Sequence, residues 1–308
     1  MKDFSIAAIS VGATALGLGV WGFSSLSTST AIHVQHTDTG RIARELMLDR
    51  DIDLSAGGQL SIDVADGDVI VRSHDSDGAR VRVYVEARDV AWGREVFDRM
   101  SFEVGESGNR ATIDAQDPRI ARDEWTEHRS LSVTVEVDVP RRVGAAVVTE
   151  DGDVRLGTLE GTVTVETMDG DIAIDRINGA EVTLRTQDGD IWAESLSAGA
   201  IGLFTSDGDV HVGEATGPVR ATTSDGDITI TLASDAETTL STGDGDISID
   251  LGSFGWELDL RGEEVAIAPA VGFEGQRREG WARGHMHGGG PKITASTGDG
   301  DVSVRSGR

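Results

Sequence analysis

The chain has no cysteine and almost no lysine, and both absences narrow its chemistry. Without cysteine it has no disulfide, no thiolate zinc site, no cysteine nucleophile and no lipid-bearing cysteine behind a leader. Lys2 and Lys292 are the only lysines, and 54 acidic residues stand against 27 basic ones, giving a formal charge of −27. A nucleic-acid partner is therefore not expected, because binding phosphates requires a basic face. Such a surface is typical of a protein that must stay soluble in high salt, or of one that meets cations outside the cell. A genomic composition that favours arginine over lysine would produce the same surface.

Aromatic residues are also scarce, at 5% of the 308 residues, whereas glycine occurs 40 times. Hydrophobic residues reach 38%, mostly Val, Ile, Leu and Ala, which is enough to bury a core. This mixture suits many short strands joined by tight turns. Composition therefore favours an ordered all-β protein.

One long apolar run lies at the N-terminus, where residues 6–23 carry no charge. Its length is close to the roughly 17–25 residues that cross a bilayer. We therefore expect a signal peptide or a transmembrane anchor over residues 1–30 and a linker over residues 31–45. The weakly positive leading segment favours an uncleaved anchor. With either alternative the rest of the chain is exported, which predicts a protein of the cell envelope, membrane-anchored or secreted.

The tripeptide Asp-Gly-Asp recurs eight times, starting at Asp66, Asp151, Asp169, Asp188, Asp207, Asp225, Asp244 and Asp299. From Asp151 to Asp244 the intervals are 18, 19, 19, 18 and 19 residues. A fixed short period of this kind predicts a solenoid.

Each repeat contains two segments of alternating hydrophobicity, such as Val163 and Val165 before the Asp-Gly and Ile172 and Ile174 after it. They predict two strands that meet at an Asp-Gly corner, and a second corner containing glycine follows. A threonine stands two residues before the first aspartate at positions 149, 167, 186, 205, 223, 242 and 297. Parallel coils would place these threonines in one ladder, about 4.8 Å apart. A meander of hairpins uses the same turn residues, but the uniform polarity of the units favours the solenoid.

The predicted fold is a single parallel β-solenoid over residues 46–306. Its expected parts are irregular first turns at 46–140, regular coils at 141–252, an insertion or cap at 253–290 and a last coil at 291–306. The segment "AWGREVFDRM" in the first part is either a short helix or an excursion. Trp256, Phe273 and Trp281 favour a cap over an interaction loop for the insertion, because the edge of a solenoid needs to be covered.

Calcium is one interpretation of the stacked aspartates, since it prefers six to eight oxygen ligands. The favoured interpretation is turn chemistry, in which aspartates cap backbone N–H groups and the glycines adopt a left-handed conformation. Two columns of carboxylates would repel one another, so salt or loosely held cations should stabilise the fold. His285 and His287 would share a strand face, but no third ligand is close in sequence. No cofactor and no metal site is therefore predicted.

The sequence contains no nucleophile elbow, P-loop or dinucleotide fingerprint. Carboxylate catalysis on the outside of a β-helix stays open, but acids that are equivalent from coil to coil lack the contrast that glycoside hydrolysis needs. We predict that the protein is not an enzyme and assign no catalytic residue.

The strand "VTVEVDVP" at Val133–Pro140, coils such as "VVTEDGDV" and "VETMDGDI", and the end "GGGPKITASTGDGDVSV" together make the chain similar to a known family. It resembles DUF4097, exported bacterial and archaeal β-strand repeat proteins that carry adhesin as a provisional label. The resemblance covers roughly residues 46–306 and implies a right-handed β-solenoid at the cell surface or in the periplasm. The resemblance implies no catalytic residues in this chain. This chain departs from the family in its complete Asp-Gly-Asp, where many relatives have a plain Gly or Ser-Gly corner.

The predicted function is that of a non-enzymatic surface protein, an adhesin or envelope structural module. A surface polysaccharide or a protein is the expected partner, bound through weak multivalent contacts, and residues 6–23 are the expected membrane contact. One alternative is an envelope-stress or scaffold component that captures a protein through residues 254–290. Another is a carbohydrate-active β-helix enzyme.

Overall fold

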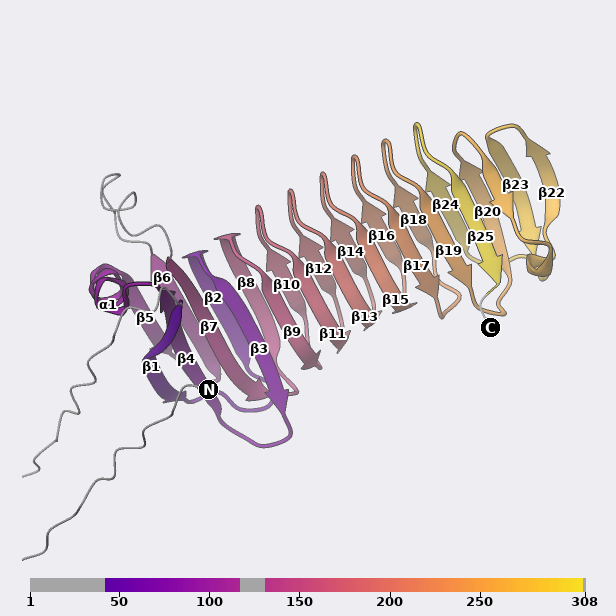
Figure 1. Cartoon of the computed structure of the whole chain (residues 1–308). Coiled ribbons are helices and arrows are strands. Elements are labelled where there is room, and N and C mark those ends of the chain that lie inside the picture. Colours follow the sequence, from indigo (N-terminus) through magenta and orange to yellow (C-terminus); the bar gives the residue numbers. More distant parts are fainter. Residues whose placement is uncertain (1–41, 117–130, 307–308) are drawn as a thin grey trace, which may run out of the picture. The chain divides into compact units, whose positions relative to one another are not determined.

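The computed structural model describes residues 42–116 and 131–306, whose strands form two long sheets (Figure 1). Sheet A has 12 strands in the order β1-β4-β7-β3-β9-β11-β13-β15-β17-β19-β25-β21. Sheet B has 13 strands in the order β22-β23-β20-β24-β18-β16-β14-β12-β10-β8-β2-β6-β5. The predicted all-β class is confirmed. No helix in the described part is long and apolar enough to cross a membrane, and the predicted leader at residues 1–30 lies outside the described residues.

Each regular coil contributes one strand to each sheet. The strands before the Asp-Gly-Asp corners lie in sheet B: β8 (Gly144–Asp151), β10 (Val163–Glu166), β12 (Val182–Arg185), β14 (Ile201–Phe204), β16 (Val219–Thr222), β18 (Thr238–Ser241) and β24 (Lys292–Ser296). The strands after the corners lie in sheet A: β9 (Val154–Leu159), β11 (Ile172–Gly179), β13 (Ile191–Ala198), β15 (Val210–Thr216), β17 (Ile228–Leu232), β19 (Ile247–Leu251) and β25 (Val302–Ser306). Figure 1 shows these pairs following one another along both sheets.

Neighbouring coils are stacked in parallel and in register. Ile172 of β11 lies beside Val154 of β9 on one side and Ile191 of β13 on the other. Val163 and Val165, and likewise Ile172 and Ile174, are fully buried between the sheets, as their alternation predicts. The residues between them face outward, so every outward position forms a row that runs from coil to coil.

The N-terminal end contains one more coil and a group of strands that extend both sheets beyond it. The coil is made by β2 (Gln59–Asp66) and β3 (Asp68–His74), which pair in parallel with β8 and β9. Antiparallel pairs then follow in sheet A, where β4 (Ala79–Ala87) lies between β7 (Leu131–Pro140) and β1 (Ala43–Ile52). In sheet B, β6 (Arg110–Gln116) joins β2 and β5 (Ser101–Glu106). The segment "AWGREVFDRM" forms α1 (Val90–Arg99), capped by the side chain of Asp89.

At the C-terminal end, the order of the strands in the sheets differs from their order along the chain. The insertion supplies β20 (Trp256–Arg261), β21 (Val265–Ile267), η1 (Pro269–Val271), β22 (Glu274–Arg278) and β23 (Trp281–Met286). The last coil lies between the regular coils and this insertion, because β24 separates β18 from β20 and β25 separates β19 from β21. Trp256 is fully buried. The insertion therefore covers the edge that the last coil would otherwise leave open.

Candidate functional site

The threonine of each corner joins two coils through its hydroxyl. In the coil of β12 and β13, Thr186 Oγ1 lies 3.2 Å from the carbonyl oxygen of Met168 and 3.0 Å from that of Gly170, both in the preceding coil. The same oxygen accepts the N–H of Gly189 at 3.2 Å. The side chain is buried, so its hydroxyl satisfies backbone groups that water does not reach. The predicted threonine ladder is present.

The glycine of each corner is required by the close approach of successive coils. A Cβ atom built on Gly189 would lie only 2.5 Å from the carbonyl carbon of Gly170 and still nearer to its oxygen. The expectation that these glycines have a left-handed backbone is wrong, because none of them is among the positive-φ residues of the described chain. A second-corner glycine, Gly217, does have a positive φ of 121°. The space between coils, not the backbone conformation, therefore selects glycine after the first aspartate.

The second aspartate of each corner caps the backbone of the next coil. Asp171 Oδ1 accepts the N–H of Asp190 at 2.9 Å, and Asp190 Oδ1 accepts the N–H of Asp209 at 2.8 Å. The same bond continues from coil to coil through Asp68, Asp153, Asp171, Asp190, Asp209, Asp227, Asp246 and Asp301. Capping of N–H groups by these carboxylates is confirmed, and it explains why an acid stands at this position in every repeat.

The first aspartates form an exposed column of like charges. Burial raises the pKa of Asp151, and the neighbouring carboxylates of Asp66 and Asp169 raise it further. Within residues 42–116 and 131–306, no group of three or more His, Asp or Glu side chains is placed to hold a metal. His285 ends up on β23 beside Glu274, with Nε2 3.5 Å from Oε2, whereas His287 lies beyond the strand with a φ of 51°. The two imidazoles therefore do not share a strand face.

Two nearly buried acids lie near the ends of the described sheets, and the sequence did not single them out. Glu136 on β7 accepts hydrogen bonds from Arg72 at 2.6 Å and from Arg44 at 2.7 Å. These bonds lower the pKa of Glu136 to about 2, against the opposing effect of burial. Burial would raise the pKa of Asp259 on β20, but the hydrogen bond from Lys292 and nearby positive charges lower it. Each acid stands at a polar position of an alternating strand, as its neighbours Thr134 and Asp138 or Glu257 and Arg261 do, so the strand sequence alone does not distinguish it.

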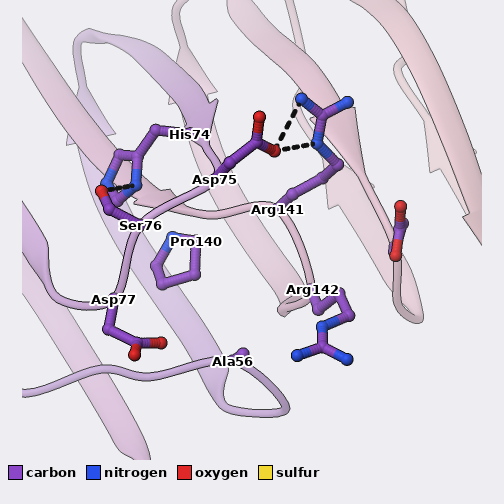
Figure 2. Close-up of a pocket in the computed structure, with 9 residues that line it drawn as sticks. Ala56, His74, Asp75, Ser76, Asp77, Pro140, Arg141 and Arg142 are labelled. Atoms are coloured by element: carbon purple, nitrogen blue, oxygen red, sulfur yellow. Dashed lines mark hydrogen bonds and ion pairs between the residues drawn. The ribbon is translucent and has the colours of Figure 1, made fainter.

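A polar pocket of about 230 Å³ lies beside the loop that follows β3 (Figure 2). Asp75 pairs with Arg141, whose Nε lies 3.0 Å from Oδ1, and Ser76 Oγ lies 2.9 Å from Nδ1 of His74. A serine nucleophile requires a histidine that a third group orients. Within the described residues, no such hydrogen bond to the other ring nitrogen of His74 is present. These contacts fix the loop, and they do not form a catalytic triad.

A wider depression of about 590 Å³ lies on the outer face of sheet A over β3, β9 and β11. It is lined by Ile70, Val71, Arg72, Ser73, Arg141, Arg155, Leu156, Gly157, Thr158, Ala173 and Asp175. On the next strand, β13, the side chain of Trp192 faces outward, since Ile191 and Ala193 on either side are buried. Trp192 is 45% exposed and stacks on His211 of β15. Polar, aromatic and small side chains thus meet on one outer face of this sheet.

Sequence comparison gives a family for the repeats whose geometry is described above. The model of the family Toastrack DUF4097 matches residues 58–305, which is most of the chain. The chain belongs to the Toastrack DUF4097 family. The expected family resemblance is therefore confirmed. Among curated proteins, none has a sequence that matches the chain.

Three solved structures similar to this Toastrack chain are distant from it in sequence. A "putative adhesin" from Bacteroides fragilis NCTC 9343 has 14% identity and a TM-score of 0.48, covering 85% of this chain and 97% of its own. A "putative adhesin" from Parabacteroides merdae ATCC 43184 has 9% identity and a TM-score of 0.47, with 87% and 97% covered. A "putative lipid binding protein" from Parabacteroides distasonis ATCC 8503 has 12% identity and a TM-score of 0.32, with 86% and 97% covered.

The repeat motif of this Toastrack chain gives no information about the outward residues that vary between coils, because the motif contains only the residues that recur. Aligning successive coils places Ala173, Trp192 and His211 at one position of β11, β13 and β15. These residues differ from coil to coil, in contrast to the constant Asp-Gly-Asp. Comparing the outward residues of successive repeats would have revealed them from the sequence alone.

Proposed function

We propose that this Toastrack chain is a non-enzymatic binding protein of the cell envelope, an adhesin or structural module exposed outside the cytoplasm. The observation that carries the proposal is the register of sheet A, in which outward rows of polar and aromatic groups continue across parallel coils. Evenly spaced groups, about 4.8 Å apart, suit a long repetitive partner that makes many weak contacts. A surface polysaccharide or an extended protein is the class of partner proposed.

Tethering by residues 6–23 belongs to the same proposal and follows from their apolar sequence. The test is protease treatment of intact cells or spheroplasts, followed by detection of the solenoid and mass determination of the N-terminus. External protease should degrade the solenoid, and the intact N-terminus should remain if the anchor is uncleaved. Protection of the solenoid until the cells are lysed would contradict the proposed location.

Binding is tested with the purified full-length chain in detergent against panels of polysaccharides and of envelope proteins. We expect retention on at least one polysaccharide or protein, with affinity that increases when the target is multivalent. If the chain is exported and folded but binds no polysaccharide and no envelope protein, in monovalent or multivalent form, the adhesin assignment is refuted.

An alternative function is capture of a protein partner through the insertion. It is favoured by β22, whose five residues are all exposed at the edge of sheet B. Deleting residues 254–290 is a poor test, because the insertion contains the buried Trp256. Glu274→Lys, at a side chain 80% exposed, should abolish capture if this alternative holds. The matched control Glu181→Lys changes an exposed acid on the regular coils and should leave capture intact.

A carbohydrate-active enzyme is a further alternative, favoured by two outward acids near the depression. Ile174 pairs with Ala193 and Arg176 with Ser195, which places Asp175 beside Glu194. Both acids are exposed, whereas glycoside hydrolysis needs one carboxyl group held protonated by its surroundings. Release of reducing ends from a bound polysaccharide, lost in Asp175→Asn, would establish the enzyme and overturn the binding-only proposal.

A further inference from the structure

The exposed indole of Trp192 stacks on the imidazole of His211, which lies on the neighbouring strand. Its ring and that of His211 are 6.4 Å apart between centroids and nearly parallel, at 6°. His211 belongs to β15, the strand on one side of Trp192. The second face of the indole therefore lies on the side of β11, the other neighbour of β13.

The outward side chain at the matching position of β11 is only a methyl group. Ala173 pairs with Trp192 in the register, and one strand further Arg155 of β9 pairs with Ala173. Two strand spacings, about 9.6 Å, thus separate the rows of Trp192 and Arg155. Ala173 and Arg155 both line the depression of about 590 Å³, together with Gly157. We call the outward space above Ala173, between the rows of Arg155 and Trp192, the slot. Trp192 lies one strand beyond Ala173 and is not itself one of the lining residues of the depression.

A single pyranose ring matches the dimensions of this slot. Carbon atoms in van der Waals contact lie about 3.5–4.0 Å apart, so one ring stacked on the indole fits within two strand spacings. The apolar C–H face of a sugar suits the large flat surface of tryptophan. Its hydroxyl groups would meet the carboxylate of Asp175 and the exposed guanidinium of Arg155, which line the same depression.

The charges favour a neutral sugar over other flat ligands. Arg155 is already paired with Asp153 at 2.8 Å, and Arg72 is already paired with Glu136 at 2.6 Å. The net charge of −27 repels polyanions such as nucleic acid. A neutral polyhydroxyl ring needs both donors and acceptors at its edge, and carboxylate and guanidinium groups supply both.

We propose that sheet A binds one neutral pyranose unit of a polysaccharide over Ala173, stacked against the open face of Trp192. This inference rests on the proposed function, since it names the partner class of the same outer face. Trp192 and Ala173 are binding residues, and His211 is a positioning residue that holds the indole upright.

The test uses the full-length chain in detergent and soluble neutral polysaccharides, namely dextran, laminarin, xylan and galactan. Calorimetry measures binding, and intrinsic fluorescence reports the environments of the six tryptophans, among which the Trp192→Phe variant identifies the signal of Trp192. We expect one of these polysaccharides to bind and to shift the emission. Trp192→Ala should weaken binding at least tenfold, and Ala173→Leu should do the same by filling the slot. Trp192→Phe should retain weaker binding and lose the emission shift.

The controls separate loss of the site from loss of the fold. Phe254→Ala removes another exposed aromatic residue, which is 38% exposed and lies outside the depression. It should leave binding unchanged. Trp192 and Ala173 face outward, so their variants should melt within about 2 °C of the wild type. His211→Ala should weaken binding less than Trp192→Ala and reduce the emission shift, which a purely structural role would not do.

The outcomes distinguish this inference from the proposed function. Polysaccharide binding that Trp192→Ala and Ala173→Leu leave unchanged would overturn the slot and keep the surface-binding role. Binding to proteins with no binding to any neutral polysaccharide would also overturn the slot alone. A chain that is retained in the cytoplasm and binds neither class would overturn the proposed function.

Discussion

Replacing Gly189 by alanine tests whether the corner glycines are needed for close stacking. The new Cβ would lie 2.5 Å from the carbonyl carbon of Gly170, whereas ordinary carbon contacts are about 3.5–4.0 Å. The two coils must therefore separate locally by about 1 Å. No change of backbone conformation is required, because Gly189 is not a positive-φ residue.

The expected cost follows from the contacts that this separation would strain. Thr186 Oγ1 bonds to the carbonyl oxygen of Gly170 at 3.0 Å and to the N–H of Gly189 at 3.2 Å, and the Asp171–Asp190 bond is 2.9 Å. Loss of about half of three hydrogen bonds worth about 0.5–1.5 kcal/mol each, together with overpacking of about 1–3 kcal/mol, gives a destabilisation of about 2–5 kcal/mol. The melting temperature should fall by about 10 °C for a domain of this size.

Urea and thermal unfolding, followed by circular dichroism, measure this loss. Gly157→Ala is the matched control, because a Cβ there meets its nearest atom, the carbonyl oxygen of Val71, at 3.5 Å. The control should change stability by less than about 1 kcal/mol, in either direction. A Gly189→Ala protein as stable as the control would refute the argument, since it would mean that neighbouring corners separate without cost.

The remaining predictions concern hydrogen bonds and charges. Thr186→Val keeps the side-chain shape but leaves the N–H of Gly189 without its acceptor, so urea unfolding should show a loss of about 1–3 kcal/mol. Glu136→Gln should cost about 2–3 kcal/mol at pH 7, because the ionised carboxylate bound by Arg72 stabilises the fold above pH 4.5. That contribution is lost as the pH falls through about 2, so the two proteins should converge in acid melts. Asp151→Asn should raise the melting temperature slightly at low salt, because the raised pKa of Asp151 means that ionisation opposes folding as the pH rises.

Salt separates screening from specific cation binding at the exposed column of first aspartates. NaCl and CaCl2 at equal ionic strength should raise the melting temperature equally, and EDTA should leave it unchanged. About 1 M NaCl should reduce the benefit of Asp151→Asn by screening the repulsion from Asp66 and Asp169, while the part due to burial remains. Stabilisation by calcium alone would contradict screening.

For Thr186→Val, wild-type stability would show that the hydroxyl bonds contribute nothing. For Glu136→Gln, a loss independent of pH would point to packing.

The repeated part of the fold was predictable because periodicity encodes local structure. Alternation placed Val163 and Ile172 inside, the spacing gave parallel coils, and the position of Thr186 gave a ladder. The reason for glycine at Gly189 was not predictable, because the atoms that exclude a side chain belong to another coil. A turn signal in one repeat does not distinguish a left-handed backbone from a close contact.

The two ends of the described fold depend on pairings between distant segments, and no short period reports those. The antiparallel group around β4 and β7 is one example. The other is the reversed order at the C-terminal end, where β24 lies between β18 and β20. The insertion could be expected to cover an edge, but its place beyond the last coil depends on the strand with which its own strands pair. The buried Glu136 also belongs to this class, because its arginine partners lie on other strands.

The constancy of Asp-Gly-Asp argues against reading it as the functional motif. Each of its parts has a contact with the neighbouring coil that explains it, apart from the exposed first aspartate, and a contact needed at every coil recurs at every coil. A binding site for one sugar ring has the opposite requirement, since it needs unlike groups at successive positions. Ala173, Trp192 and His211 are unlike groups in one outward row. In a solenoid of this kind, recognition is therefore expected where the repeat is broken on the outer face, while the unbroken repeat holds that face in register.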